Sequence, residues 1–191
     1  ECGVPYGLPK LRWVDSLPCM STLRRVYSVF GLVSILSFGL YGEDKQKPIK
    51  ALLITGGCCH NYLFQSQALI AGVAKHAKVD WKIVNEGGRG TKAMIPLYKN
   101  PNWAKGYDVV VHNECFANTD NKAYVQSITK VHKAGVPAVG IHCAMHTYRA
   151  AKFDDWRDFL GVTSKRHDHK ANYPVKQLVN HPILKGMPKD W

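Results

Sequence analysis

Short apolar runs alternate with longer segments of helical periodicity along most of this chain, and this alternation restricts the fold more than any other feature. Runs that are typical of buried strands occupy residues 51–54, 79–84, 107–112 and 137–141. Segments with apolar residues at helical spacing lie between them, at 62–77 and 120–133. Strand, helix and strand in succession require right-handed crossovers, so the sequence predicts an α/β fold, a mostly parallel sheet with helices on both faces.

The remaining boundaries follow from turn and capping residues. Thr119 or Asp120 is expected to cap the second of these helices. Residues 144–159 predict a further, interrupted helix, and 175–179 predict a fifth strand. Folds of this kind usually continue through another strand or two. We therefore expect a three-layer domain at 49–191 that is incomplete at its C-terminus.

The N-terminal region has the pattern of a processing signal. Met20 is followed by a short positive stretch, an apolar run, small residues at Gly39 and Gly42, and then polar residues. These are the three parts of a secretory signal peptide. We expect residues 20–42 to be the signal, with cleavage near Gly39 or Gly42, and residues 1–19 to be upstream translation. The apolar run is shorter than the ~20 residues that span a bilayer, so we expect a periplasmic or secreted protein without a permanent membrane anchor.

The net charge is +12, from 26 Lys and Arg against 14 Asp and Glu. The basic residues are scattered singly, and the densest cluster, at 165–170, is short and interrupted by Asp168. Nucleic-acid binding normally needs a focused basic patch with aromatic or base-reading partners. The charge therefore predicts a basic solvated surface, and no nucleic-acid partner is expected.

The predicted mature chain carries an even number of cysteines, Cys58, Cys59, Cys115 and Cys143, which is typical of an oxidising compartment. Adjacent Cys58 and Cys59 are poorly placed to bridge each other. A disulfide is therefore expected to join one of them to Cys115 or Cys143, and buried free thiols are the alternative.

Polar residues follow three of the predicted strands. They are Cys58, Cys59, His60 and Asn61 after the first, His112, Asn113, Glu114 and Cys115 after the third, and His142, Cys143 and His146 after the fourth. The carboxyl ends of parallel strands form one rim, where such sheets bind ligands. We therefore expect a single pocket rich in imidazole and thiol, with one carboxylate.

Within this pocket, three residues are the candidates for catalysis: Glu114, His142 and Cys143. A carboxylate and an imidazole can act as acid and base in proton transfer. The expected substrate-binding residues are His60, Asn113, His146 and His167.

A second cluster, at residues 166–169, places one histidine on each side of an aspartate. Such a cluster can ligate a metal or orient a partner, and a solvated polar loop is the other interpretation. If this loop folds over the rim, His60, His142 and His167 are expected to surround a divalent ion. No cofactor is otherwise required for the predicted chemistry.

The sharpest local motif is Val-Gly-Ile-His-Cys-Ala at 139–144, a strand that runs directly into a helix. A side chain at such a turn projects into the pocket beside helix N-terminal amides, which favour developing negative charge. With other stretches this motif resembles the ThuA family, named for trehalose utilisation. The similar stretches are 53–57 with His60, 107–111, 140–146, Trp156 with 159–161, and 181–183.

The resemblance covers about Ile49 to the end of the chain. It implies a flavodoxin-like, class I glutamine amidotransferase-like fold and a carbohydrate substrate, such as trehalose, a related disaccharide or a keto-sugar. Isomerisation or eliminative cleavage of a keto-sugar would fit. The amidotransferases place a catalytic Cys where this chain has His142, with Cys143 one residue later, which argues against a glutaminase. A Cys143-dependent hydrolase and a non-catalytic sugar-binding module are the alternatives.

Overall fold

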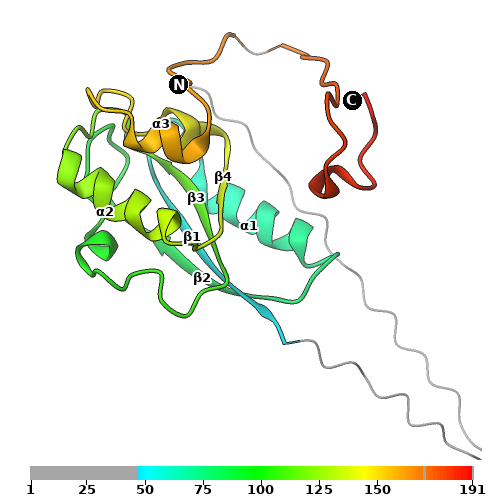
Figure 1. Cartoon of the computed structure of the whole chain (residues 1–191), viewed down its shortest axis with the longest axis horizontal. Coiled ribbons are helices and arrows are strands. Elements are labelled where there is room, and N and C mark those ends of the chain that lie inside the picture. Colours follow the sequence, from blue (N-terminus) through cyan, green and yellow to red (C-terminus); the bar gives the residue numbers. More distant parts are fainter. Residues whose placement is uncertain (1–46, 170, 191) are drawn as a thin grey trace, which may run out of the picture. The chain divides into compact units, whose positions relative to one another are not determined.

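The computed structural model describes residues 47–169 and 171–190. Within these residues, a single sheet contains four parallel strands in the order β2-β1-β3-β4 (Figure 1). The strands are β1 (Ile49–Gly57), β2 (Val79–Asn85), β3 (Val109–Cys115) and β4 (Ala138–Gly140). This order is the flavodoxin-like one, with its switch point between β1 and β3, where the carboxyl ends of the strands leave a crevice for a ligand.

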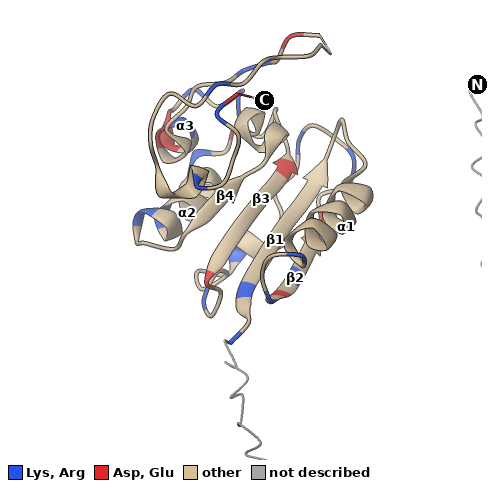
Figure 2. Cartoon of the chain, turned by 90° about the vertical axis from the view of Figure 1, so that its right-hand side faces the viewer, with Lys and Arg blue, Asp and Glu red and all other residues tan. Residues whose placement is uncertain are grey.

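Helices cover both faces of the sheet, which confirms the predicted three-layer architecture. Helix α1 (Tyr62–Val73) lies on one face, and α2 (Lys122–Lys133) and α3 (Asp155–Leu160) lie on the other (Figure 1). Charged residues concentrate on helices and loops, while the strands between the layers are mostly uncharged (Figure 2). Three short 3-10 helices complete the described elements: η1 (Pro96–Lys99), η2 (His142–His146) and η3 (Pro182–Leu184).

Asparagines start the two longer helices. The Asn61 side chain accepts a hydrogen bond from the Phe64 amide, and the Asn121 side chain accepts one from the Tyr124 amide. The expected cap of α2 at Thr119 or Asp120 is therefore wrong by one or two positions. Thr119 instead exchanges hydrogen bonds with the backbone of Ala93 and fixes the preceding loop.

The two sides of the sheet are packed unequally. The larger core lies under α2 and α3, where Leu52, Ile54 and Val110 of the sheet contact an aromatic group formed by Tyr98, Trp103, Tyr124, Tyr148 and Trp156. On the other face, α1 buries only Tyr62 and Ser66, while Leu63 and Phe64 are each 65% exposed. Most of the hydrophobic stabilisation of the fold therefore comes from the side of the sheet that α2 and α3 cover.

Two element predictions in the second half of the chain are wrong. Residues 175–179 form no strand; the described part of this region has an isolated bridge between Lys176 and Asp190, and Leu178 is 87% exposed. The segment 144–159 is not one interrupted helix but η2, a run of turns and the short α3. An apolar run becomes a strand only beside a strand edge with free hydrogen-bonding groups, and the run itself does not reveal such an edge.

The predicted signal peptide at 20–42 and the upstream stretch at 1–19 lie outside the described residues. Among the described helices, none combines the length and the apolar composition that crossing a bilayer requires.

Candidate functional site

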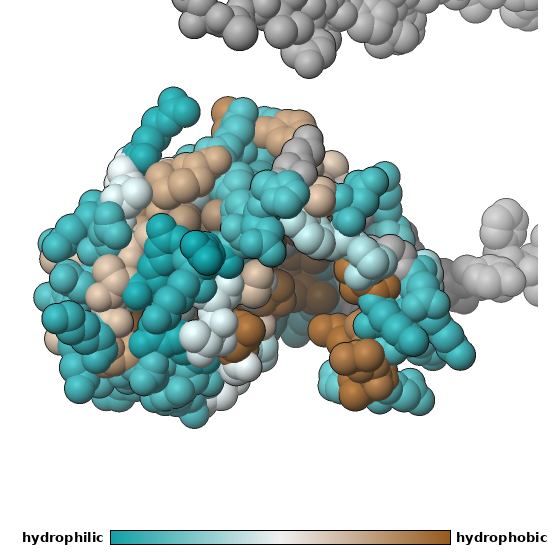
Figure 3. All heavy atoms as spheres, turned by 90° about the horizontal axis from the view of Figure 1, so that it is seen from above, coloured by the Kyte–Doolittle hydropathy of each residue, from teal (hydrophilic) through white to brown (hydrophobic). Residues whose placement is uncertain are grey.

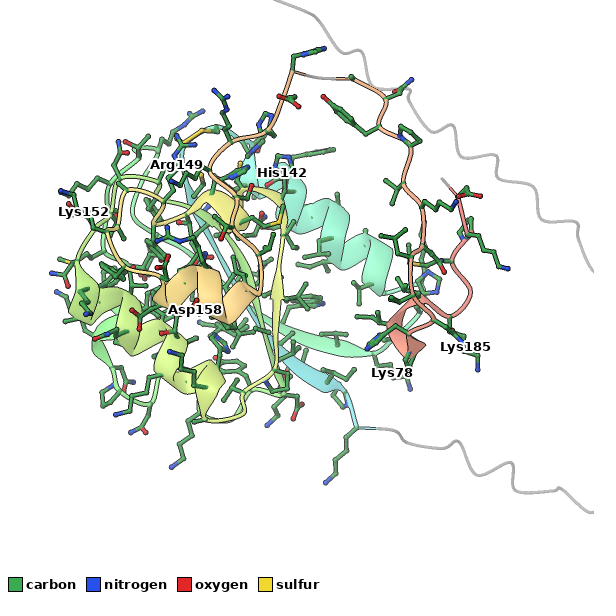
Figure 4. All side chains as sticks on the ribbon, turned by 45° about the horizontal axis from the view of Figure 1, so that its top comes forward. Lys78, His142, Arg149, Lys152, Asp158 and Lys185 are labelled. Carbon is green, nitrogen blue, oxygen red and sulfur yellow. A yellow bond between two sulfur atoms is a disulfide. The ribbon has the colours of Figure 1, made fainter. Side chains whose placement is uncertain are left out.

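The predicted elbow at the end of β4 is present. Ile141 is extended, His142 has φ +43°, and η2 begins at once. A left-handed backbone at a residue other than glycine is uncommon and strained. The Ile141 amide donates to the His112 carbonyl at 2.9 Å and fixes the turn to β3. As a result His142, which is labelled in Figure 4, is exposed, while Cys143 is buried, at 5% exposure.

The loop after β1 brings His60 to the same place. Gly57 has φ +96°, and a Cβ there would overlap the Cys115 carbonyl, so the chain can pass β3 this closely only with glycine. The His60 ring packs edge-on against His142, with centroids 4.9 Å apart, and its Nε2 lies 2.9 Å from Cys143 Sγ. The ligating atoms of His60, His142 and Cys143 all lie within 4.8 Å of one another. We call these three residues the elbow cluster.

Three further sulfur atoms adjoin the elbow cluster. Cys58 and Cys59 form a disulfide, which corrects the expectation that neither would bridge its neighbour. Their Sγ atoms lie within 4.8 Å of Cys115 Sγ. Cys115 and Cys143 carry free thiols that hydrogen-bond to each other. The four cysteines thus meet at the carboxyl ends of β1, β3 and β4.

The local environment changes the proton affinity of these groups. The hydrogen bond with Cys143 lowers the pKa of Cys115 to about 7, and the same bond, together with burial, raises the pKa of Cys143. Burial lowers the pKa of His60, and the neighbouring His142 and His167 lower it further, so an uncharged ring is favoured there.

The loop at 164–167 returns over the elbow, which was the condition for His167 to join His60 and His142. Ser164 Oγ lies 3.1 Å from His146 Nδ1, and Arg149 donates to the Lys165 carbonyl. The His167 ring centroid lies 5.7 Å from that of His142 and 5.9 Å from that of His146. His146 and His167, two of the predicted substrate-binding residues, therefore lie beside His142. His167 is not among the close ligating atoms, a position that Cys143 takes instead.

Two cavities adjoin these residues. The larger, of about 690 Å³, is lined by Gly57, Cys59, His60, Asn61, Tyr62, Leu63, Asn85, Gly88 and Arg89. The smaller, of about 140 Å³, is lined by Cys58, Cys59, Cys115, Ala117, Cys143, His146, Arg149, Arg166 and His167. The sequence interpretation missed Asn85 and Arg89. The signal for them was the glycine-rich turn after β2, whose carboxyl end lies on the same rim.

Glu114 does not share this pocket, and its expected grouping with His142 is wrong. Strand β3 continues to Cys115 rather than ending at His112, so its side chains alternate between the two faces. The Glu114 side chain is fully buried and accepts a hydrogen bond from Tyr98 at 2.9 Å. Its Oε1 also lies 3.0 Å from His112 Nδ1. Glu114 therefore belongs to a buried polar chain under α2, on the far side of the sheet from His60.

Asn113 lies on the α1 face but is enclosed. Its amide donates to the Gln65 side chain of α1 at 3.2 Å, and it is 3% exposed. It lines neither cavity beside the elbow cluster. The structure thus gives Asn113 a contact that ties α1 to β3. Its predicted role in substrate binding stays a prediction.

The comparisons agree with this architecture. No protein-family model matches the sequence, and no curated protein matches it either. A similar solved structure, determined at 1.75 Å, is that of a protein from Parabacteroides merdae ATCC 43184 provisionally described as thua-like. The two chains are 21% identical, with a TM-score of 0.52 over 76% of this chain and 60% of that one. The likeness confirms the predicted fold, and the neighbour's description agrees with the resemblance to the ThuA family.

Proposed function

We propose that this protein is a carbohydrate-processing enzyme whose reaction takes place at the elbow cluster. The observation that carries the proposal is the convergence of two imidazoles and a thiol, from the β1 and β4 loops, beside a cavity of about 690 Å³. The ThuA-like resemblance of the sequence and the thua-like description of the structural neighbour support the substrate class. A strained backbone at His142 is typical of positions whose side chain must project into a pocket.

The lining of the cavity suits a sugar. Asn61 and Asn85 present amides and Arg89 presents a guanidinium, groups that exchange hydrogen bonds with hydroxyls. Tyr62 and Leu63 add apolar surface for the face of a ring. This mixture of a few polar groups on a concave surface favours a polar small molecule over a macromolecule.

The proposed chemistry is proton transfer next to a carbonyl of an oxidised sugar. A base at the cluster removes the proton from the carbon beside the ketone, and the electron pair forms an enolate. Collapse of the enolate expels the glycosidic oxygen, which takes up a proton from the site. Glu114 has no part in this step, because its side chain lies on the opposite face of the sheet.

A second candidate is a hydrolase with Cys143 as nucleophile. The distance of 2.9 Å between His60 Nε2 and Cys143 Sγ favours it, because a thiol paired with an imidazole is the usual arrangement for an activated cysteine. The raised pKa of Cys143 weakens this candidate, because the thiolate is the reactive form. We further propose, from the sequence pattern at 20–42, that the protein acts in the periplasm or outside the cell.

The proposal is tested by incubating the purified protein with keto-glycosides and with the parent disaccharides, and by following release of the free sugar by NMR. His60→Ala and His142→Ala should each lower kcat/KM on the keto-glycosides at least 100-fold, the usual weight of a proton-transfer group. Glu114→Gln should stay within about threefold of the wild-type rate, because a group that never meets the substrate adds nothing to transition-state stabilisation.

Two outcomes would contradict this assignment. Cleavage abolished by Cys143→Ser or by alkylation, with His142→Ala retaining activity, would replace it with the thiol hydrolase. Binding of the sugar without turnover, unaffected by His142→Ala except in Kd, would show a non-catalytic binding protein.

A further inference from the structure

We infer that the elbow cluster is a zinc site, with His60, His142 and Cys143 as its three protein ligands. The inference deepens the proposed function. The binding of the ion does not depend on that function, but the catalytic role of the ion rests on it. Two imidazoles and a thiol, from segments 83 residues apart, place their ligating atoms within 4.8 Å of one another. No carboxylate belongs to this group.

The distances suit a small tetrahedral ion. Zinc binds imidazole nitrogen at about 2.0–2.1 Å and thiolate sulfur at about 2.3 Å, which places neighbouring ligand atoms roughly 3.5 Å apart. His60 Nε2 and Cys143 Sγ lie 2.9 Å apart, and no pair in the cluster exceeds 4.8 Å. Side-chain movements on the order of 1 Å would form the coordination sphere without moving the backbone.

The chemistry of the ligands selects the metal class. Imidazole and thiolate are borderline and soft ligands, which favour Zn²⁺ over the oxygen-preferring Ca²⁺ and Mg²⁺. Cys143 would bind as thiolate and release its proton to solvent.

The surroundings favour an open, reactive site over a closed, structural one. Three protein ligands leave a fourth tetrahedral position, as in catalytic zinc sites. His60 lines the larger cavity, where a sugar would bind, and Cys143 lines the smaller one, so the cluster lies between two spaces that a fourth ligand could reach. A water molecule there would take over the proton transfer of the proposed function, or the sugar carbonyl would bind in its place.

The frame of the site is fixed before any ion binds. The elbow is tied to β3 through the Ile141 amide, and the Cys58 amide donates to the Cys115 carbonyl at 3.3 Å. Tyr62 Oη donates to the Cys58 carbonyl at 2.7 Å, and Asn61 caps α1 directly after His60. Rigid support of this kind keeps metal ligands in a productive geometry.

The experiment uses the full chain, stripped with chelator and then titrated with ZnCl₂, with metal content measured by mass spectrometry. We expect one Zn²⁺ per chain. Titration with CoCl₂ should give the intense visible bands of a tetrahedral site and a thiolate-to-cobalt charge-transfer band. Cys143→Ser should abolish the charge-transfer band, and His60→Ala and His142→Ala should each weaken zinc binding at least tenfold, because each removes one of three ligands.

Matched controls separate this site from its neighbours. His76→Ala removes an exposed histidine remote from the cluster and should bind zinc as the wild type does. His167→Ala tests the ligand expected from the sequence and should retain the cobalt spectrum. The inference is overturned if the wild type binds no zinc, or if Cys143→Ser keeps the charge-transfer band.

The two proposals fail separately. Zinc binding without any reaction on keto-glycosides keeps the site and rejects the proposed function. Unchanged turnover by the chelated protein keeps the function and rejects the role of the ion.

Discussion

At the scale of single residues, one backbone angle determines which of two neighbouring side chains is exposed and which is buried. His142 adopts φ +43° at the elbow, so its ring is exposed while the next side chain, Cys143, is buried. The sequence identified this turn because an apolar strand ran straight into a small-residue helix start. It did not reveal which of the two side chains would be exposed and which buried, since that depends on the backbone angle at His142.

The strain at His142 gives a prediction about stability. His142→Gly should raise the free energy of unfolding by about 0.5–1 kcal/mol, because glycine adopts a positive φ without steric penalty. His142→Ala keeps the unfavourable angle and should give no such gain. Urea denaturation measures the unfolding free energy of both variants. Chelator is present so that loss of a metal ligand does not contribute to the difference. Equal stabilities for the two variants would show that the angle carries no strain.

A second residue-scale prediction concerns His132, which is partly buried in the last turn of α2. Burial lowers its pKa to about 4, and its Nδ1 lies 2.9 Å from the Val136 carbonyl. Between pH 4 and 6.5 the unfolded chain therefore binds a proton that the folded chain does not, so stability falls as pH falls through this window. Because the ring is partly exposed, solvent screening should keep the loss near pH 4 to about 1–2 kcal/mol.

Urea denaturation at pH 7 and pH 4.5 checks this effect. His132→Gln keeps a side chain that can donate to Val136 but cannot titrate, so its stability should change less between the two pH values than that of the wild type. His76→Gln is the matched control and should retain the wild-type difference. If His132→Gln shows the same pH dependence as the wild type, another group is responsible.

At the scale of elements, periodicity predicted the four strands and the two longer helices but placed their ends poorly, and it failed for the segments 144–159 and 175–179. Strand β3 was expected to stop at His112 because polar residues begin there, yet it runs to Cys115. Its polar residues are buried and paired, Asn113 with Gln65 and Glu114 with Tyr98, so the strand continues without apolar side chains. A sequence shows the polarity of a residue, but not whether the fold provides it with a buried hydrogen-bond partner.

The cap of α2 provides a prediction at this scale. Asn121→Ala should lower the free energy of unfolding by about 1 kcal/mol, because the Tyr124 amide loses its acceptor. Asp120→Ala, at the adjacent exposed position, should change it by less than about 0.5 kcal/mol, since its ion pair with Lys92 is solvated. Thermal and urea denaturation at neutral pH compare the two. A larger effect at Asp120 would assign the cap to that residue.

At the scale of the whole molecule, the sheet topology was the most predictable property and the grouping of site residues was partly so. The rule that ligands bind at the carboxyl ends of parallel strands correctly brought His60, His142 and Cys143 to one rim. Seen from above, the described part of the molecule shows hydrophilic residues around smaller hydrophobic groups (Figure 3). The rule failed for Glu114. Successive side chains of β3 point to opposite faces of the sheet, and Glu114 points to the face opposite His60.

The alternation along β3 has a consequence for how this protein can vary. Four consecutive residues serve opposite layers: the imidazole of His112 and the carboxylate of Glu114 enter the aromatic core, while Asn113 and Cys115 face α1. Inserting or deleting one codon in this stretch would exchange the two sets, burying a thiol among aromatic rings and moving a carboxylate beneath α1. A substitution here changes one contact at a time, whereas an insertion or deletion moves every following side chain of the strand to the opposite face.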